Sequence, residues 1–140
     1  MKHSIIYITA LLVLTLGTGQ LKAQTSTTDN SNYVVMSKNI KQLQPILMTA
    51  TALAKEDGKA YGEFKVLFCG KTVTDIKANP DFQFLLKQAA LQKIEVYVCG
   101  LSLKAFGVNP EELPQSLEVV DNAILYGFQL KKQGFISLTI

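Results

Sequence analysis

Apolar positions along the chain form short runs separated by longer, mixed stretches. Runs that are brief and rich in β-branched or aromatic residues predict strands. The last of these runs alternates F-I-S-L-T-I, which is the period of a half-buried strand. Five predicted strands follow one another, at residues 33–36, 64–69, 94–99, 117–120 and 135–140.

The stretches between the runs show helical spacing. In segment 39–56 apolar residues recur every three to four positions, and the regular helix is expected to begin close to Pro45, because proline is not accommodated deep inside a helix. Asn79 and Pro80 predict a second helix start, with a capping side chain followed by proline at the first helical position. The amphipathic stripe behind them consists of Phe82, Leu85, Leu86 and Ala89.

Two further helices complete the pattern. One is short, over residues 101–106, and the other runs from a cap at Asp121 to about Gln133, with Gly134 after its last turn. Strands that alternate with helices through short loops predict an α/β fold with a five-stranded, mainly parallel sheet covered on both faces. In such sheets ligands and chemistry collect at the carboxyl ends of the strands.

The N-terminal part of the chain has a different character. The first 23 residues predict a cleavable signal peptide, with a basic start, a twelve-residue apolar run at 5–16 and the small residue Ala23 at the cut. The run is shorter than the roughly 20 residues that a spanning helix needs. Residues 24–32 predict a flexible polar leader before one domain at 33–140. We therefore expect an exported, periplasmic or secreted protein with no membrane attachment; an uncleaved anchor is the alternative, because Leu21 is not ideal near the cut.

Charge and composition exclude several classes of function. The chain has fourteen lysines, no arginine and eleven acids, and removal of Lys2 and Lys22 with the predicted signal leaves a net charge of +1. This balance argues against a nucleic-acid partner. The single histidine, His3, also lies in the predicted signal, so Ser–His–Asp catalysis, Cys–His catalysis and His-ligated zinc are not expected. No cofactor or metal site is predicted.

Two other motifs are interpreted as structural. Gly70-Lys71-Thr72 resembles the end of a phosphate-binding loop, but the required earlier glycine is replaced by Lys65. We therefore expect a turn into a helical segment there. Glu111 and Glu112 follow Asn109-Pro110 and are ordinary acids of a first helical turn.

The two cysteines are the candidate chemistry. Cys99 ends the third predicted strand just before a short helix, where free N–H groups favour a thiolate suited to nucleophilic attack, persulfide formation or disulfide exchange. Cys69 ends the second predicted strand in the same way. The alternatives are inert burial, or a disulfide between Cys69 and Cys99, which requires their strands to be neighbours. The pattern alone leaves this choice open.

The segment I-E-V-Y-V-C-G-L-S-L-K-A-F-G at 94–107 resembles the signature of the DsrE/DsrF-like family: a strand ending in cysteine, a small residue, Ser/Thr-Leu-Lys/Arg and a closing glycine. The resemblance extends over residues 33–140. It includes the F-K-V-L-F-C-G turn, Glu112-Leu113, Val119-Val120 and the ending K-Q-G-F-I.

The resemblance implies a three-layer α/β/α domain with strand order 4-3-2-1-5 that assembles into trimers or hexamers. The best-understood members are cytoplasmic sulfur-relay proteins that carry sulfur as a cysteine persulfide, a role that maps onto Cys99. The leading hypothesis is an exported sulfurtransferase-like carrier or thiol-redox protein rather than a hydrolase or NAD-dependent enzyme, with an unidentified sulfur donor and acceptor. Cys69 is then a second thiol or disulfide partner. The alternative is a non-catalytic oligomeric binding protein. The chain departs from the family in its predicted export and in having Cys69.

Overall fold

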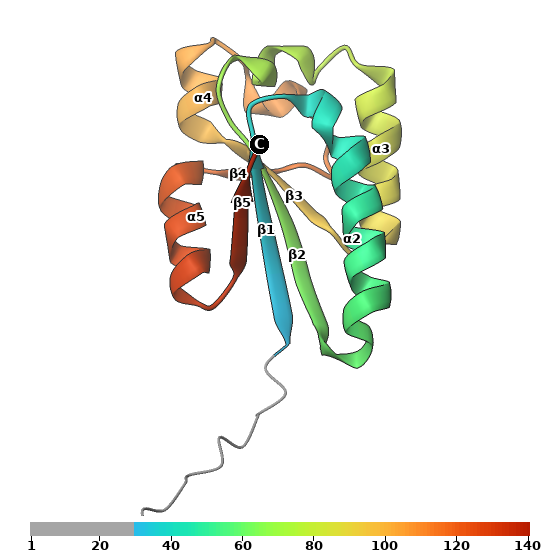
Figure 1. Ribbon diagram of the computed structural model, residues 1–140. Coiled ribbons are helices and arrows are strands. Elements are labelled where there is room, and N and C mark those ends of the chain that lie inside the picture. Colours follow the sequence, from blue (N-terminus) through green and yellow to red (C-terminus); the bar gives the residue numbers. More distant parts are fainter. Residues whose placement is uncertain (1–29) are drawn as a thin grey trace, which may run out of the picture.

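The computed structural model describes residues 30–140, so the predicted signal peptide and residues 24–29 of the predicted leader lie outside the described residues. Five strands form a single sheet in the order β4-β3-β2-β1-β5, and every neighbouring pair is parallel (Figure 1). The order implied by the family resemblance and the parallel α/β fold are both confirmed. The strands are β1 (Ser31–Ser37), β2 (Tyr61–Phe68), β3 (Glu95–Cys99), β4 (Glu118–Val120) and β5 (Ile136–Thr139).

Helices cover the two faces of the sheet unequally. Figure 1 shows α2 and α3 side by side on one face and α5 on the other, with α4 near the carboxyl ends of the strands. The α-helices are α2 (Leu43–Asp57), α3 (Pro80–Leu91), α4 (Gly100–Ala105) and α5 (Ala123–Lys132). Short 3-10 turns occupy Ile40–Gln42, Gly58–Ala60, Lys71–Asp75 and Pro110–Glu112.

The strongest local signals give the expected boundaries. The Asn79 side chain caps α3 by accepting the N–H of Phe82 at 2.9 Å, with Pro80 as the first helical residue. Pro45 lies in the first turn of α2, where its missing N–H costs nothing. Gly134 follows α5 with a φ of 93°, a conformation that glycine adopts without strain.

The predicted cap at Asp121 is wrong. The side chain of Asn122 caps α5 instead, accepting the N–H groups of Ile124 and Leu125 at 3.0 and 3.2 Å. The reason is a long-range contact: the carbonyl of Asp121 accepts the N–H of Leu101 at 3.0 Å, which ties the end of β4 to α4. The first backbone bond of α5 therefore starts one residue later, from the N–H of Tyr126 to the carbonyl of Asn122 at 2.9 Å.

The side chains form one buried cluster on each face of the sheet. The larger cluster lies under α2 and α3, where the rings of Phe68 and Phe82 meet edge to face at 5.5 Å. The smaller lies under α5 and consists of Val34, Leu67, Cys69, Tyr97, Cys99, Ala123, Leu130 and Phe135. Both cysteines therefore belong to the side of the sheet that a single helix covers.

The prediction that the last strand is half-buried is wrong. All four residues of β5 are exposed, including Ile136 at 57% and Leu138 at 60%. The strand order explains the error, because β5 is the outermost strand of the sheet and pairs only with β1. Its alternating pattern is intact, but within residues 30–140 no element covers its apolar side.

Candidate functional site

The carboxyl ends of β2 and β3 bring the two cysteines together. Leu67 is paired with Tyr97 and Phe68 with Val98, so Cys69 and Cys99 are the next residues of two hydrogen-bonded strands. Neighbouring strands lie about 4.8 Å apart. Both side chains are on the α5 face and in the same buried cluster, and both are free thiols.

Two helix starts meet at the sulfur of Cys99. The residue is the N-cap of α4, as the strand–helix junction predicted. In addition, the N–H of Ala123, the first residue of α5, donates to the Cys99 Sγ at 3.4 Å. This second donor is 24 residues away in the sequence and reaches the thiol because β4 pairs with β3.

Ser102 links the two cysteine-bearing loops. Its Oγ accepts the N–H of Gly70 at 2.8 Å, which joins α4 to the loop after β2. The Ser102 side chain also helps to lower the pKa of the Cys99 thiol. The hydroxyl that accepts the Gly70 N–H still has its own proton to donate.

The two thiols have opposite pKa shifts. Burial raises the pKa of Cys99, but hydrogen bonds from the Ala123 N–H, the Ser102 side chain and the amides of Ser102 and Leu101 outweigh it, and the pKa is lowered. Burial raises the pKa of Cys69, the negative charge of Cys99 raises it further, and Lys38 opposes the rise. The pair therefore consists of a polarised Cys99 and a protonated Cys69.

Both sulfur-bearing residues are nearly inaccessible, at 4% exposure for Cys99 and 7% for Cys69. Sequence reasoning found both cysteines and the helix after Cys99. It assigned no role to Ser102, although Ser102 stands within the quoted motif, and it missed Ala123. No local signal marks Ala123, since its contact depends on the placement of β4 beside β3.

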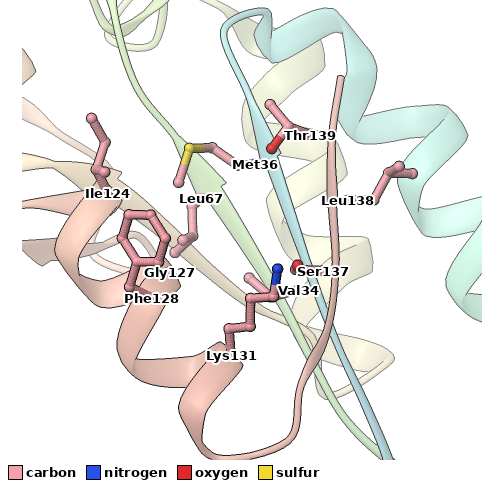
Figure 2. Close-up of a pocket in the computed structure, with 10 residues that line it drawn as sticks. All are labelled: Val34, Met36, Leu67, Ile124, Gly127, Phe128, Lys131, Ser137, Leu138 and Thr139. Atoms are coloured by element: carbon pink, nitrogen blue, oxygen red, sulfur yellow. The ribbon is translucent and has the colours of Figure 1, made fainter.

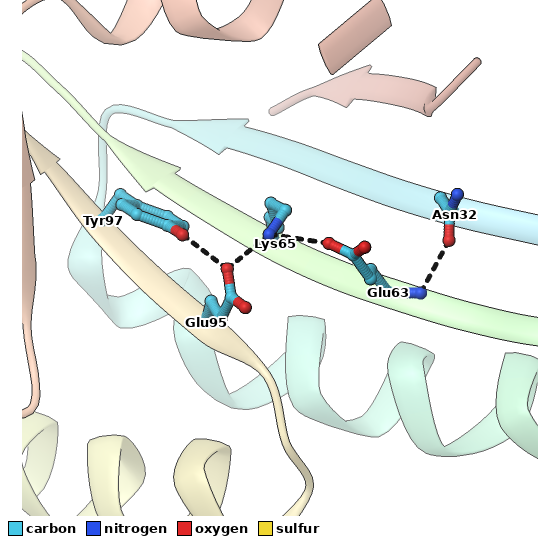
Figure 3. Close-up of polar contacts among 5 residues, drawn as sticks. All are labelled: Asn32, Glu63, Lys65, Glu95 and Tyr97. Atoms are coloured by element: carbon cyan, nitrogen blue, oxygen red, sulfur yellow. Dashed lines mark hydrogen bonds and ion pairs between the residues drawn. The ribbon is translucent and has the colours of Figure 1, made fainter. Parts of the chain in front are cut away.

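A second polar cluster lies on the same face of the sheet, nearer the amino ends of the strands (Figure 3). The Lys65 ammonium pairs with Glu63 at 2.8 Å and with Glu95, whose carboxylate also accepts the hydroxyl of Tyr97. The Lys65 Nζ lies 5.8 Å from the ring centroid of Tyr97 and 5.9 Å from that of Phe135. Each of these charged groups has a partner, so we interpret the cluster as structural.

A groove separates α5 from β1 and β5 (Figure 2). It has a volume of about 290 Å³, and Lys131 and Ser137 are among the residues that line it. Neither cysteine lines it. Its apolar lining residues are Val34, Met36, Leu67, Ile124, Phe128 and Leu138.

The described part of the chain also limits other kinds of site. Across residues 30–140 no three His, Cys, Asp or Glu side chains gather in a way that could hold a metal ion. Among the same residues, no helix has both the length and the apolar character required to cross a bilayer.

Two solved structures share the fold. A protein of unknown function from Methanobacterium thermoautotrophicum, MTH1491, is 12% identical with a TM-score of 0.66, and the match covers 79% of this chain and all of that one. A conserved protein of unknown function from Bacteroides thetaiotaomicron, BT1422, is 16% identical with a TM-score of 0.59 over 78% of this chain and 95% of its own. A comparison with curated proteins finds no match. The family model of the DsrE/DsrF-like family matches residues 32–138. The chain belongs to the DsrE/DsrF-like family.

Proposed function

We propose that the chain is an exported sulfur carrier or thiol-redox protein that acts through Cys99. The observation that carries the proposal is the Ala123 N–H, which donates to the Cys99 Sγ at 3.4 Å. The lowered pKa of Cys99, to which Ser102 contributes, agrees with it. The thiolate is the reactive form of cysteine, and donors of this kind stabilise it. The general association of the family with sulfur relay agrees with this chemistry.

The loading step is a simple exchange between sulfur atoms. The Cys99 thiolate attacks the outer sulfur of a donor persulfide, forms a new S–S bond and breaks the bond between the two donor sulfurs, which leaves the donor as a thiolate. The persulfide on Cys99 is again an anion. The donors that favour the thiolate, Ala123 N–H and Ser102, are placed to stabilise it as well.

Loading requires that a buried sulfur reach its donor. Cys99 pairs with Val120 of β4, a three-residue edge strand, and the segment 121–122 leads from there into α5. A short edge strand has few ladder hydrogen bonds to break, so local opening there costs less than unfolding the domain. We therefore place the entry route on the β4 side of the site.

The test follows the alkylation rate of Cys99 against pH in the Cys69→Ser variant, which removes the second thiol. The expected midpoint lies below the free-thiol value of about 8.5. The same variant in denaturant is the control, since its labelling should follow the free-thiol value. A native midpoint at or above that of the unfolded chain, or labelling that occurs only on unfolding, would contradict the proposal.

If the alkylation test has that outcome, the better-supported function is that of a non-catalytic binding protein. The observation that favours this alternative is the apolar groove beside α5, which neither cysteine lines.

For either function, we propose that the partner on the α5 face is a second copy of the chain within a trimer or hexamer. The exposed apolar residues that support the proposal are Ile124, Leu125 and Phe128 on α5.

A further inference from the structure

The site contains a second thiol whose position is fixed by the sheet. Cys69 and Cys99 follow the paired residues Phe68 and Val98, and both face the α5 side. We propose that Cys69 is a resolving thiol. It attacks the Sγ of Cys99 when Cys99 carries a persulfide, closes a Cys69–Cys99 disulfide and releases the outer, carried sulfur as hydrosulfide. This inference rests on the proposed sulfur-carrying role of Cys99.

The geometry permits the disulfide with little rearrangement. Neighbouring parallel strands place paired Cα atoms about 4.8 Å apart, within the range of about 4.4–6.8 Å found for disulfides. Each cysteine is also the last extended residue before the chain turns, Cys99 into α4 and Cys69 into the loop at Gly70. Small backbone adjustments at these two positions do not disturb the paired centre of the strands.

The reaction balances without an added oxidant. The Cys69 sulfur forms a bond to the Cys99 Sγ, and the bond between that Sγ and the carried sulfur breaks. The Cys69 thiol first passes its proton to the carried sulfur, and the Cys69 thiolate so formed makes the attack. The carried sulfur then leaves as HS⁻ with the electron pair of the broken bond. Two cysteine sulfurs are oxidised to a disulfide while the carried sulfur is reduced to sulfide.

The unequal environments of the thiols set the order of events. Because the pKa of Cys99 is lowered and that of Cys69 is raised, Cys99 reacts first with a sulfur donor and Cys69 stays protonated. Cys69 keeps its proton until it transfers that proton to the carried sulfur, which makes Cys69 a thiolate nucleophile and the carried sulfur a leaving group. The disulfide then blocks reloading until a dithiol reductant reopens it, so each reduction permits one release of sulfur.

The experiment uses the full-length chain, reduced and desalted, and mixes it with inorganic tetrasulfide. Intact mass and released sulfide are measured together over time. For the unaltered chain we expect a transient gain of one sulfur (about 32 Da), followed by a disulfide and one sulfide per chain. The Cys69→Ser variant should keep the added sulfur and release sulfide slower by about tenfold or more, because the neighbouring thiol is lost. The Cys99→Ser variant should neither load nor release on this timescale.

The outcomes separate the inference from the function beneath it. If the unaltered chain keeps its added sulfur while Cys69 remains free for alkylation, the resolving role is wrong and the carrier role stands. If the Cys99→Ser variant gains sulfur on Cys69 at the rate of the unaltered chain, Cys69 is the carrier and not the resolving thiol. That result also overturns the inference. If neither the unaltered chain nor Cys69→Ser gains sulfur, the carrier function itself fails. Cys69→Ala provides the same test should a buried serine prevent folding.

Discussion

At the scale of single residues, the chemistry of Cys99 depends on neighbours that are remote in the sequence. The thiol alone would be a small buried side chain, since only 4% of the residue is exposed. Its pKa is lowered because hydrogen-bond donors, led by Ala123 and Ser102, outweigh the effect of burial. A substitution of either donor should therefore change the pKa of Cys99 although the cysteine itself is unaltered.

The Ser102→Ala variant tests this dependence. Loss of the hydroxyl should raise the pKa of Cys99, so that alkylation in a Cys69→Ser background begins at a higher pH. The Gly70 N–H also loses its acceptor, which should cost about 1 kcal/mol in urea unfolding. Ser116→Ala, at an exposed position, is the matched control and should change neither quantity. An unchanged labelling profile in Ser102→Ala would show that the hydroxyl does not act on the sulfur.

At the scale of elements, sequence reasoning located the five strands and four α-helices but not all of their bounds or relations. The first strand begins at Ser31, inside the predicted leader. Local signals such as Asn79-Pro80 give the correct helix start because the capping bond is made within four residues. The cap of α5 was misplaced by one residue because Asp121 is held by Leu101, 20 positions earlier. The neighbouring cysteines followed only from the strand order, which the family resemblance supplied and periodicity did not.

Asn122 links the stability of α5 to the reactivity of Cys99. The Asn122→Ala variant removes the cap and should destabilise the fold by about 1 kcal/mol. It should also raise the pKa of Cys99, because the first turn that holds the Ala123 N–H becomes looser. Asn79→Ala removes an equivalent cap from α3 on the opposite face. The control should lose similar stability in urea unfolding and keep the thiol midpoint; equal midpoint shifts in both variants would point to a general loosening instead.

The Lys65 cluster joins β2 to β3 and gives the fold an acid-sensitive contact. Burial raises the pKa of Glu95, but hydrogen bonds from Lys65 and Tyr97 outweigh it and lower the pKa. A lowered folded-state pKa contributes stability above the unfolded value of about 4.3, and this contribution is lost as pH falls through the folded-state pKa. Acid should therefore weaken the cluster before it weakens the apolar core.

We expect Glu95→Gln to cost about 1 kcal/mol near neutral pH, a modest figure because the carboxylate is 45% exposed. The variant should also lose less stability than the unaltered chain on acidification below about pH 4. Urea unfolding at several pH values measures both effects. Glu118→Gln, on the edge strand β4, is the control. Parallel pH curves for the Glu95→Gln and unaltered chains would contradict the assignment.

At the scale of the whole molecule, the uneven covering of the sheet predicts assembly. Phe128 is 62% exposed beside the groove of α5, and Phe84 is 60% exposed on α3. We expect Phe128→Lys to shift the light-scattering mass from a trimer or hexamer to a monomer, because a lysine there cannot be buried against a second copy. Phe84→Lys, with the same change on the other layer, should leave the mass unchanged. A monomer mass for the unaltered chain at micromolar concentration would end the proposal.

Export is a separate property of the whole chain. If the first 23 residues are removed as predicted, N-terminal sequencing of the protein recovered outside the cytoplasm should begin near Gln24. Recovery of Met1 on a membrane-bound product would support the uncleaved anchor instead.

Gly100 is the residue after Cys99, and its surroundings limit which side chains can replace it. A Cβ at this position would lie 3.2 Å from the Asp121 carbonyl oxygen and 3.3 Å from both the Asp121 Cα and the Val120 carbonyl oxygen, all of them backbone atoms that have no other rotamer. Gly107 has open space around it, and its φ of 66° favours glycine without excluding asparagine. In a mutational scan, Asn should therefore be among the better-tolerated replacements at position 107, whereas any side chain at position 100 must displace the chain at 120–121. We expect natural variants with a larger residue after the cysteine to carry compensating changes at the end of β4, so that these two segments vary together.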